Sequence, residues 1–570
     1  MRRLARFAPP RPPAPGVRVR RRRLLAGSAA ALFLGACKSA PKASLSGGSS
    51  GAQIDESTLT PQRGGIFQTL GIRPLEHLNS LTVVTPNNDF YFRGVYDTLL
   101  SWNFKPFQDY RTEYKLIGSL AESWDQPDNT TYVFHIRRNV KWHDGAPLSA
   151  ADVKFSYEYI ADPANKSPYS SYFRNMASLS QPDDYTIQIQ TKTPDVTFLK
   201  VLQGSTQILP KHVLDRGDQF EKVAIGSGPF KIDSYNAETG VVYSANRDYW
   251  KQGRPFLDGW RVLAPADDTG RIAAFTAGRN DALHLTDRRQ VDAALALVKN
   301  ARVMPFIRDN AGGMFLKLDK PPFNDKRTRQ IVQLTIDRRE MLKTLHGGEG
   351  LINPPGINSV AKDWAIPEAE LAKLPGWRVP KQQDLDDAKQ LLSQTGLGNG
   401  GLTFTLSFDQ TVDFVKADAT VIAEQFRKLG ITANLQPLES TTYLKNRTSG
   451  DYQALIDPSG GNSSPGDGAW QQVIRSGGFY NKMPINDAEL DRLIDAQAQE
   501  FDESKRKAMF LQIEHLLLDN VYAIPLTSDP GYLVCQPYLH GWADNMTLNV
   551  DDEDWGGTWF DRSTAPKIRK

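Results

Sequence analysis

The chain has 570 residues, of which 40% are hydrophobic and 23% charged, a composition typical of a globular protein long enough for several domains. Its formal charge of +3 depends on nine arginines within residues 1–36, because the remaining chain holds 59 basic and 65 acidic residues. The body of the protein is therefore not basic, which argues against a nucleic-acid partner.

Candidate groups for catalysis or metal binding are scarce. Only Cys37 and Cys535 are present, and the eight histidines are scattered, so neither a disulfide framework nor a metal site is expected. The sequence lacks a G-x-S-x-G elbow, a Walker A loop and an H-E-x-x-H helix. These absences predict a protein that is not an enzyme and needs no cofactor.

The first 36 residues have the pattern of a signal peptide. A basic stretch ending at Arg23 precedes the apolar run Leu24–Phe33, which is shorter than the ~20 residues that span a bilayer. The arginine pair Arg21-Arg22 leaves open whether export follows the twin-arginine or the general secretory route.

Cys37 follows the small residues Gly35 and Ala36, and this segment resembles the lipobox of bacterial lipoproteins. The resemblance implies that a lipid is attached to Cys37; the alternative is an ordinary signal peptide with an incidental cysteine. Residues 37–64 are rich in Ser, Gly and Ala and predict a flexible tether.

From residue 65 onward, strand and helix patterns alternate, which indicates an α/β fold. The expected elements, in chain order, are a strand over 131–136, a helix over 150–160 capped by Ser149, a strand over 241–244, one helix over 325–345, a helix over 414–429 ending at Gly430, and two helices within 487–520. His143-Asp144-Gly145 predicts a tight turn rather than a metal or acid–base pair.

Several ordered segments resemble bacterial extracellular solute-binding proteins of family 5, the oligopeptide- and dipeptide-binding group. These segments are Leu120–Trp124, Tyr132–Arg137, Val140–Val153, Gly226–Phe230 with Asn246–Trp250, Pro321–Gln330 with Ile336–Arg338, Asp487–Ile494 and Ile524–Leu526. The resemblance covers roughly residues 64–545. Within these segments, Trp124, Trp142 and Trp250 are expected to anchor the core rather than to contact ligand.

The resemblance implies a two-lobed periplasmic binding protein of type II (cluster C), with an additional α/β domain and a hinge between the lobes. By analogy, lobe I comprises 65–96, 204–302 and 532–570, the additional domain 97–203 and lobe II 303–531.

The implied function is the extracytoplasmic, lipid-anchored substrate-binding protein of an ABC importer. It captures a peptide or other small polar solute in the cleft between the lobes and delivers it to a permease that works with an ATPase; the binding protein itself is expected to be a monomer. Two alternatives stay open: a sensory or surface lipoprotein with the same fold, and a secreted enzyme.

The sequence departs from the peptide-binding branch of the resembled family at one position of a loop in lobe II. In the peptide-binding branch a loop aspartate pairs with the ligand's amine, whereas Ser464 stands at that position here, and Asp467 replaces the aspartate only if the loop has shifted. Other members of the resembled family bind sugars, nickel complexes, haem or opines, and a hydroxylated ligand such as an oligosaccharide stacked on Trp470 would suit the neighbouring Asn and Ser residues. Nickel is less favoured, because no histidine pair or cysteine stands out. The residues predicted to bind ligand are Thr85, Asn87, Asn88, Phe90, Asp409, Tyr443, Asn462, Ser463, Ser464, Asp467 and Trp470.

Overall fold

The computed structural model describes residues 59–71, 75–82, 90–102, 116–204, 206–264, 268–357, 364–398, 400–457, 470, 473–478, 483–542 and 555–569. The predicted leader, tether and lipid-attachment residue Cys37 lie outside them. Among the helices of the described ranges, none has both the length and the apolar run that a membrane span requires.

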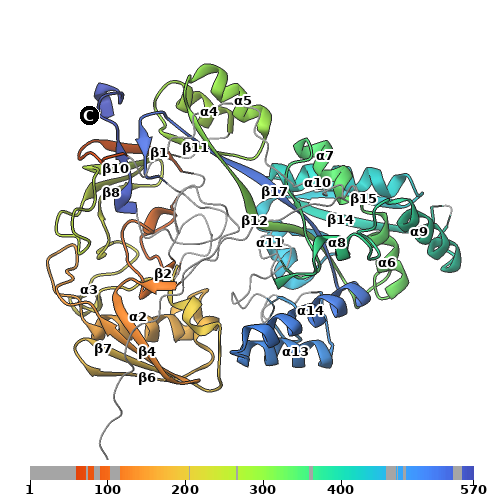
Figure 1. The fold of residues 1–570 in the computed structure, drawn as a ribbon, viewed down its shortest axis with the longest axis horizontal. Coiled ribbons are helices and arrows are strands. Elements are labelled where there is room, and N and C mark those ends of the chain that lie inside the picture. Colours follow the sequence, from red (N-terminus) through yellow and green to blue (C-terminus); the bar gives the residue numbers. More distant parts are fainter. Residues whose placement is uncertain are drawn as a thin grey trace, which may run out of the picture. The chain divides into compact units, whose positions relative to one another are not determined.

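Three sheets carry most of the fold (Figure 1). A four-stranded sheet has the order β1 (Ile66–Leu70), β10 (Gly259–Leu263), β9 (Gly240–Ala245) and β8 (Phe230–Asn236), with β1 parallel to β10. An antiparallel sheet has the order β4 (Ala121–Asp128), β5 (Thr131–Ile136), β7 (Thr186–Thr191) and β6 (Met176–Asp183). The helix α2 (Ala150–Ala161) packs beside this second sheet.

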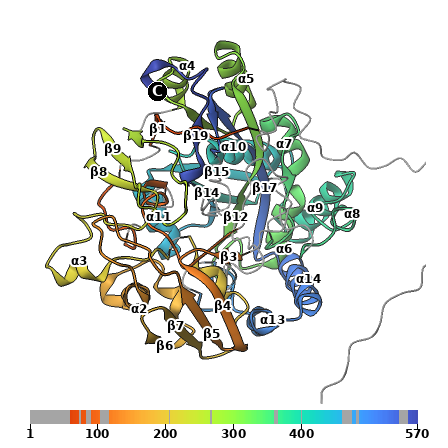
Figure 2. The ribbon, with the colours of Figure 1, turned by 60° about the vertical axis from the view of Figure 1, so that its left-hand side comes forward.

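The third sheet has seven strands. Its order is β11 (Ala282–Leu285), β17 (Ala523–Cys535), β12 (Arg302–Leu316), β16 (Ala454–Asp457), β14 (Thr403–Asp409) and β15 (Thr432–Leu438), with β13 (Leu351–Ile352) paired to β17. The long strands β12 and β17 lie side by side in both views (Figures 1 and 2). Their pairing shifts register between Ile307 and Gly313, which marks bulges that bend the strands.

Helices cover both faces of this sheet. Along β12, Met314 and Leu316 belong to one apolar cluster and Phe315 to another, because successive side chains point to opposite faces. The helices that contribute to these two clusters or pack beside them are α6 (Lys326–Thr335), α7 (Arg338–His346), α9 (Gln382–Gln394) and α10 (Asp413–Arg427) for the first, and α11 (Ser440–Ser449), α13 (Ala488–Gln499) and α14 (Glu503–Asn520) for the second.

Smaller elements are also present. They include the helices α3 (Lys211–Asp215), α4 (Asp268–Thr276), α5 (Arg288–Leu297) and α8 (Glu368–Leu371), and the short strand pairs β2 (Leu100–Trp102) with β3 (Leu116–Gly118) and β18 (Leu539–His540) with β19 (Trp559–Phe560). The helices α4 and α5 bury their apolar side chains against β11 and β17.

The predicted strand over 131–136 is confirmed as β5, and the predicted helix over 150–160 as α2. Ser149 caps α2 as expected, and Asp152 returns its carboxylate to the Ser149 N–H to complete a capping box. The α13–α14 pair and the end of α10 near Gly430, whose φ is +74°, also match the expectation.

The single helix predicted over 325–345 is wrong. The structure divides it into α6 and α7, because Ile336 is extended and Asp337 caps a new helix. The Asp337 carboxylate accepts hydrogen bonds from the N–H groups of Arg339 and Glu340, each at 3.0 Å. An aspartate in this role competes with continuation of the preceding helix.

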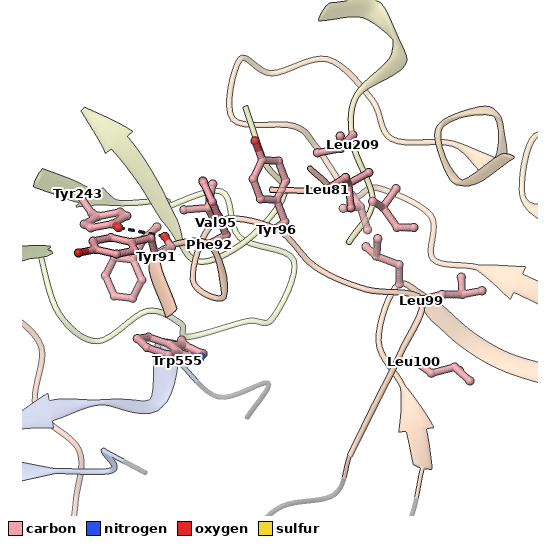
Figure 3. Close-up of a cluster of buried hydrophobic side chains, with 14 of the residues drawn as sticks. Leu81, Tyr91, Phe92, Val95, Tyr96, Leu99, Leu100, Leu209, Tyr243 and Trp555 are labelled. Atoms are coloured by element: carbon pink, nitrogen blue, oxygen red, sulfur yellow. Dashed lines mark hydrogen bonds between the residues drawn. The ribbon is translucent and has the colours of Figure 1, made fainter. Parts of the chain in front are cut away.

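The largest apolar cluster joins the first two sheets. Figure 3 shows part of it, including the hydrogen bond of 3.0 Å from the Tyr243 hydroxyl to the Tyr91 carbonyl. Trp142 is 2% exposed within this cluster, and Trp124 and Trp250 pack against it, so all three tryptophans lie at the core.

Two segments that stand out in the sequence converge on Asp97. Its carboxylate accepts hydrogen bonds from Ser227 Oγ at 2.7 Å, and from Tyr249 Oη and Trp250 Nε1 at 3.1 Å each. Burial raises the pKa of Asp97, although these three donors oppose the shift. The segments Gly226–Phe230 and Asn246–Trp250 therefore share a structural role in one buried polar centre.

The His143-Asp144-Gly145 segment forms the predicted tight turn, with Gly145 at φ +90°. Gly226 N–H donates to His143 Nδ1 at 3.1 Å, and the other ring nitrogen lies 3.0 Å from the Gly228 carbonyl. Burial is the main cause that lowers the pKa of His143 to about 4. The imidazole is thus neutral at pH 7 and ties this turn to Gly226–Gly228.

Candidate functional site

The parallel strands β14 and β16 end in two aspartates. Leu406 pairs with Ala454 and Ser407 with Leu455, and this register places Asp409 level with Asp457. Both carboxyl groups are buried, at 5% and 0% exposure. The carboxyl ends of parallel strands are where α/β proteins generally bind ligands. We refer to Asp409, Asp457 and the α11 residues that contact them as the carboxyl edge.

Asp409 is held by neutral donors. Its Oδ1 accepts hydrogen bonds from Thr411 N–H at 2.9 Å and Thr411 Oγ1 at 2.7 Å, and its Oδ2 from Ser440 Oγ at 2.6 Å. Ser440 is the first residue of α11, and α10 begins at Asp413. Two helix amino termini near Asp409 place positive partial charge where it stabilises this carboxylate.

Asp457 is held by a cation and a phenol. Arg447 forms an ion pair with its carboxylate, and the Tyr443 hydroxyl lies 3.4 Å from Asp457 Oδ2 and donates to the Ile456 carbonyl at 3.2 Å. Burial, followed by the charge of Asp457, raises the pKa of Tyr443. At neutral pH the tyrosine is therefore a hydrogen-bond donor.

The structure thus brings together two of the predicted ligand residues, Asp409 and Tyr443, because α11 contacts the ends of both strands. The sequence analysis missed Asp457 and Arg447. One signal could have found them: Asp457 ends a run of buried apolar residues directly before the predicted ligand loop, and Arg447 lies one helical turn after Tyr443.

Trp470 and Phe90 lie in apolar surroundings. Trp470 is 1% exposed, its indole N–H donates to the Gly356 carbonyl at 2.6 Å, and its ring centroid lies 4.5 Å from that of Phe510. Phe90 contacts Trp260 and Trp555 edge to face. Trp470 belongs to the same apolar cluster as Tyr443, whereas Phe90 packs against the cluster of the first two sheets. The role of Trp470 and Phe90 in ligand binding stays a prediction.

The remaining predicted ligand residues lie outside the described ranges; they are Thr85, Asn87, Asn88, Asn462, Ser463, Ser464 and Asp467. Residues 458–469 follow Asp457 directly in the chain, so the carboxyl edge is the last described point before four of these residues. Within the described ranges, no group of three or more His, Cys, Asp or Glu residues could hold a metal ion.

The chain is similar to known bacterial solute-binding proteins. The sequence profile of the bacterial extracellular solute-binding proteins, family 5, matches residues 115–481. The oligopeptide-binding protein AppA of Bacillus subtilis is 27% identical over 457 residues, which is 75% of this chain and 78% of AppA. The periplasmic oligopeptide-binding protein OppA of Salmonella typhimurium is 24% identical over 461 residues, 75% and 82% of the two chains.

Another relative is named for a different ligand. The probable deoxycholate-binding periplasmic protein YgiS of Escherichia coli is 25% identical over 449 residues, 74% of this chain and 81% of YgiS. Similarity at this level therefore extends to proteins named for unlike ligands.

Solved structures confirm the predicted fold class, the two-lobed type II binding-protein fold with an additional α/β domain. AppA of Bacillus subtilis in complex with a nonapeptide matches with a TM-score of 0.73 at 22% identity, over 88% of this chain and all of AppA. DppA of Helicobacter pylori in complex with a peptide matches with a TM-score of 0.72 at 21% identity, over 88% and 99%. Because the family profile covers more than half of the 570 residues, the chain belongs to the bacterial extracellular solute-binding proteins of family 5.

Proposed function

We propose that this protein is the extracytoplasmic substrate-binding protein of an ABC importer, and that it binds a peptide or other small polar solute and passes it to a permease. The observation that carries the proposal is the family match over residues 115–481, a range that includes the carboxyl edge. Among its relatives, OppA and AppA are named for oligopeptide binding, which favours a peptide as the ligand.

The carboxyl edge supports a binding role rather than a catalytic one. The Asp409 carboxylate is engaged by hydroxyl and amide donors, and that of Asp457 by Arg447. Carboxylates held in this way have a fixed position at the ends of β14 and β16, and Asp457 directly precedes residues 458–469 in the chain. We assign ligand contact to residues of that segment together with Asp409 and Tyr443, and we assign no catalytic residue.

The domain boundaries and the membrane anchor belong to the same proposal. Lobe I comprises 65–96, 204–302 and 532–570, the additional domain 97–203 and lobe II 303–531. A monomer is tethered to the outer face of the membrane by a lipid on Cys37. Replacing Cys37 with Ser is expected to move the protein from the membrane fraction to the soluble fraction, as measured by fractionation and immunoblotting; a variant that stays with the membrane would contradict the lipid anchor.

The ligand is tested by thermal unfolding of the purified protein with a panel of tri- to nonapeptides, the same peptides N-acetylated, oligosaccharides and deoxycholate. A ligand that binds only the folded state raises the melting temperature, by an amount that grows with its concentration. A shift with free but not acetylated peptides would support a peptide held by its amine. A shift with deoxycholate or sugars alone would replace the peptide in the proposal, and no shift with any compound would contradict it.

A further inference from the structure

One backbone hydrogen bond joins two parts of the molecule that have separate apolar cores. Val196 N–H donates to the Ala498 carbonyl at 2.9 Å. Val196 follows β7, whose residues Ile187 and Ile189 lie in the core shared by the first two sheets. Ala498 lies in α13, which packs into a core on one face of the seven-stranded sheet. The bond therefore connects a segment of the predicted additional domain with one of predicted lobe II.

The donor side is held rigidly by its own sheet domain. Asn175 Nδ2 donates to the Thr193 carbonyl at 3.1 Å and to Asp195 Oδ2 at 3.2 Å, while the Tyr132 hydroxyl donates to the Asp195 carbonyl at 2.9 Å. Asp195 Oδ1 in turn accepts from Thr197 N–H at 2.9 Å. These contacts fix the backbone on both sides of Val196, so its N–H keeps one direction relative to β5 and β7.

The acceptor side is a carbonyl that its own helix leaves without a donor. In a continuing helix the Asp502 N–H would bond to the Ala498 carbonyl, but it donates instead to Glu500 Oε1 at 2.8 Å. The end of α13 is fixed separately, because Arg506 Nε donates to Gln497 Oε1 at 3.1 Å. The last turn of a helix carries negative partial charge, which strengthens its attraction for an N–H donor.

We infer that the 193–197 loop and the carboxyl end of α13 form a latch, which holds the additional domain against lobe II and opens when these two bodies separate. Both surfaces are fixed within their own bodies, so relative motion breaks this bond without disturbing either one. The additional domain shares its apolar core with lobe I, and the chain passes between lobe I and lobe II through β12 and β17, whose bulges allow bending. A single hydrogen bond shifts an equilibrium by about 2- to 10-fold, which is small enough to be reversible.

The test uses the ligand-free full chain with a Cys37→Ser background and spin labels at Glu158→Cys on α2 and Glu489→Cys on α13, two exposed positions. Val196→Pro removes the donor N–H, and Val196→Ala is the matched control that keeps it. We expect the Pro variant to gain a longer inter-label distance, with an open population about 2- to 10-fold larger, and the Ala variant to match the unsubstituted protein.

Identical distance distributions for the Pro and Ala variants, at an unchanged melting temperature, would overturn the latch. If the Pro variant does not fold, hydrogen exchange of the Val196 amide in the unsubstituted chain decides instead. A protected amide supports the latch, and exchange at the rate of an unstructured peptide refutes it.

Discussion

Two buried tyrosines in the apolar cluster beside β16 differ in the hydrogen bonding of their hydroxyl groups. Tyr443 is 3% exposed and donates a hydrogen bond to the Ile456 carbonyl, whereas Tyr452 is 7% exposed and its hydroxyl has no hydrogen-bond partner among the residues that the structure describes. Burial is the main cause that raises the pKa of both residues. Comparing the two tyrosines therefore separates the contribution of one hydrogen bond to stability from the contribution of burying a phenol ring.

Tyr443→Phe is expected to lower the free energy of unfolding by about 1 kcal/mol, because the Ile456 carbonyl loses its donor. Tyr452→Phe, the matched control, is expected to be neutral or slightly stabilising, since it removes a polar atom that burial leaves unsatisfied. Urea denaturation measures both values. Equal losses would show that the Tyr443 hydrogen bond does not contribute to stability.

Glu514 on α14 is fully buried, and its carboxyl accepts a hydrogen bond from Ile366 N–H at 2.8 Å. Burial raises the pKa of Glu514 to about 9, so the folded state holds a proton that the unfolded state releases near pH 4.5. Because the pKa of Glu514 is higher in the folded than in the unfolded state, the contribution of its protonated carboxyl to stability is fully present below about pH 4.5. That contribution is lost as the pH rises through this window toward 9.

Glu514→Gln keeps an acceptor for Ile366 and removes the titration. Between pH 5 and 8, the unfolding free energy of the wild type is expected to fall relative to that of the variant by about 1.4 kcal/mol per pH unit. Urea denaturation at several pH values gives the difference, in which the other titrating groups cancel. Parallel curves would mean that Glu514 is ionised in the folded protein.

At this scale, the sequence allowed the type of residue at the site to be predicted better than its partners. Asp409 and Tyr443 were predicted, but that Ser440, Arg447 and Asp457 meet them depends on α11 packing across two strand ends. Such contacts join residues from separate elements, and no local pattern encodes them. For Trp470 the partner differs from the predicted one. The sequence suggested a sugar stacked on its indole, whereas the ring packs against Phe510 in the structure.

Among the elements, local signals predicted most helices and strands well. Ser149 and Asp152 specify the start of α2 through their own side chains, and Gly430 marks the end of α10. The division at Ile336-Asp337 was missed, because apolar spacing continues through it and only the capping geometry of Asp337 interrupts the helix. A helix start inside a periodic stretch is therefore easily overlooked.

The Gly226-Ser227-Gly228 segment has a geometric reason for its glycines. A Cβ at Gly226 would lie 1.8 Å from the Val95 carbonyl oxygen, so the two backbones are in direct contact. Gly145, by contrast, has φ +90° but open space around its Cα. The first glycine is required by packing against another segment and the second by backbone conformation alone.

Gly226→Ala is expected to lower the unfolding free energy by about 3 kcal/mol or more, because the Val95 backbone has to move. Gly145→Ala is expected to cost about 1 kcal/mol, the strain of a positive φ. Thermal and urea denaturation compare the two variants. A smaller loss for Gly226→Ala than for Gly145→Ala would contradict the close approach seen here.

Across the whole molecule, residues far apart in sequence complete one buried charge pair. Arg569 Nε donates to Asp281 Oδ1 at 2.9 Å, and the two side chains are 2% and 0% exposed. The Tyr538 hydroxyl also donates to Asp281 Oδ1, at 2.6 Å, and Arg569 Nη1 donates to Gln68 at 2.9 Å. Burial raises the pKa of Asp281, while Arg569 lowers it.

Arg569→Met is expected to lower the unfolding free energy by about 3–5 kcal/mol, because it leaves the Asp281 carboxylate buried without its cation. Arg562→Met, at an exposed position seven residues earlier in the chain, is the control and is expected to change stability by less than about 0.5 kcal/mol. Denaturation at pH 7 measures both. A loss of similar size in the two variants would show that the buried pair is not a stabilising contact.

Sequence alone predicted the fold class but not this long-range pairing. The family resemblance implied a discontinuous first lobe, yet nothing local to Arg569 indicates a buried partner 288 residues earlier. The same holds for β17, which lies between β12 and β11 and so joins the last part of the chain to its middle.

This arrangement determines when the protein finishes folding. The seven-stranded sheet is complete only when β17 has inserted between β12 and β11. The contacts of β1 in the four-stranded sheet are complete only when Arg569 has reached Asp281 and Gln68. Contacts of such long sequence separation form late, because closing long loops costs entropy. Until β17 and Arg569 have both left the ribosome, the nascent chain therefore cannot complete these two sheets.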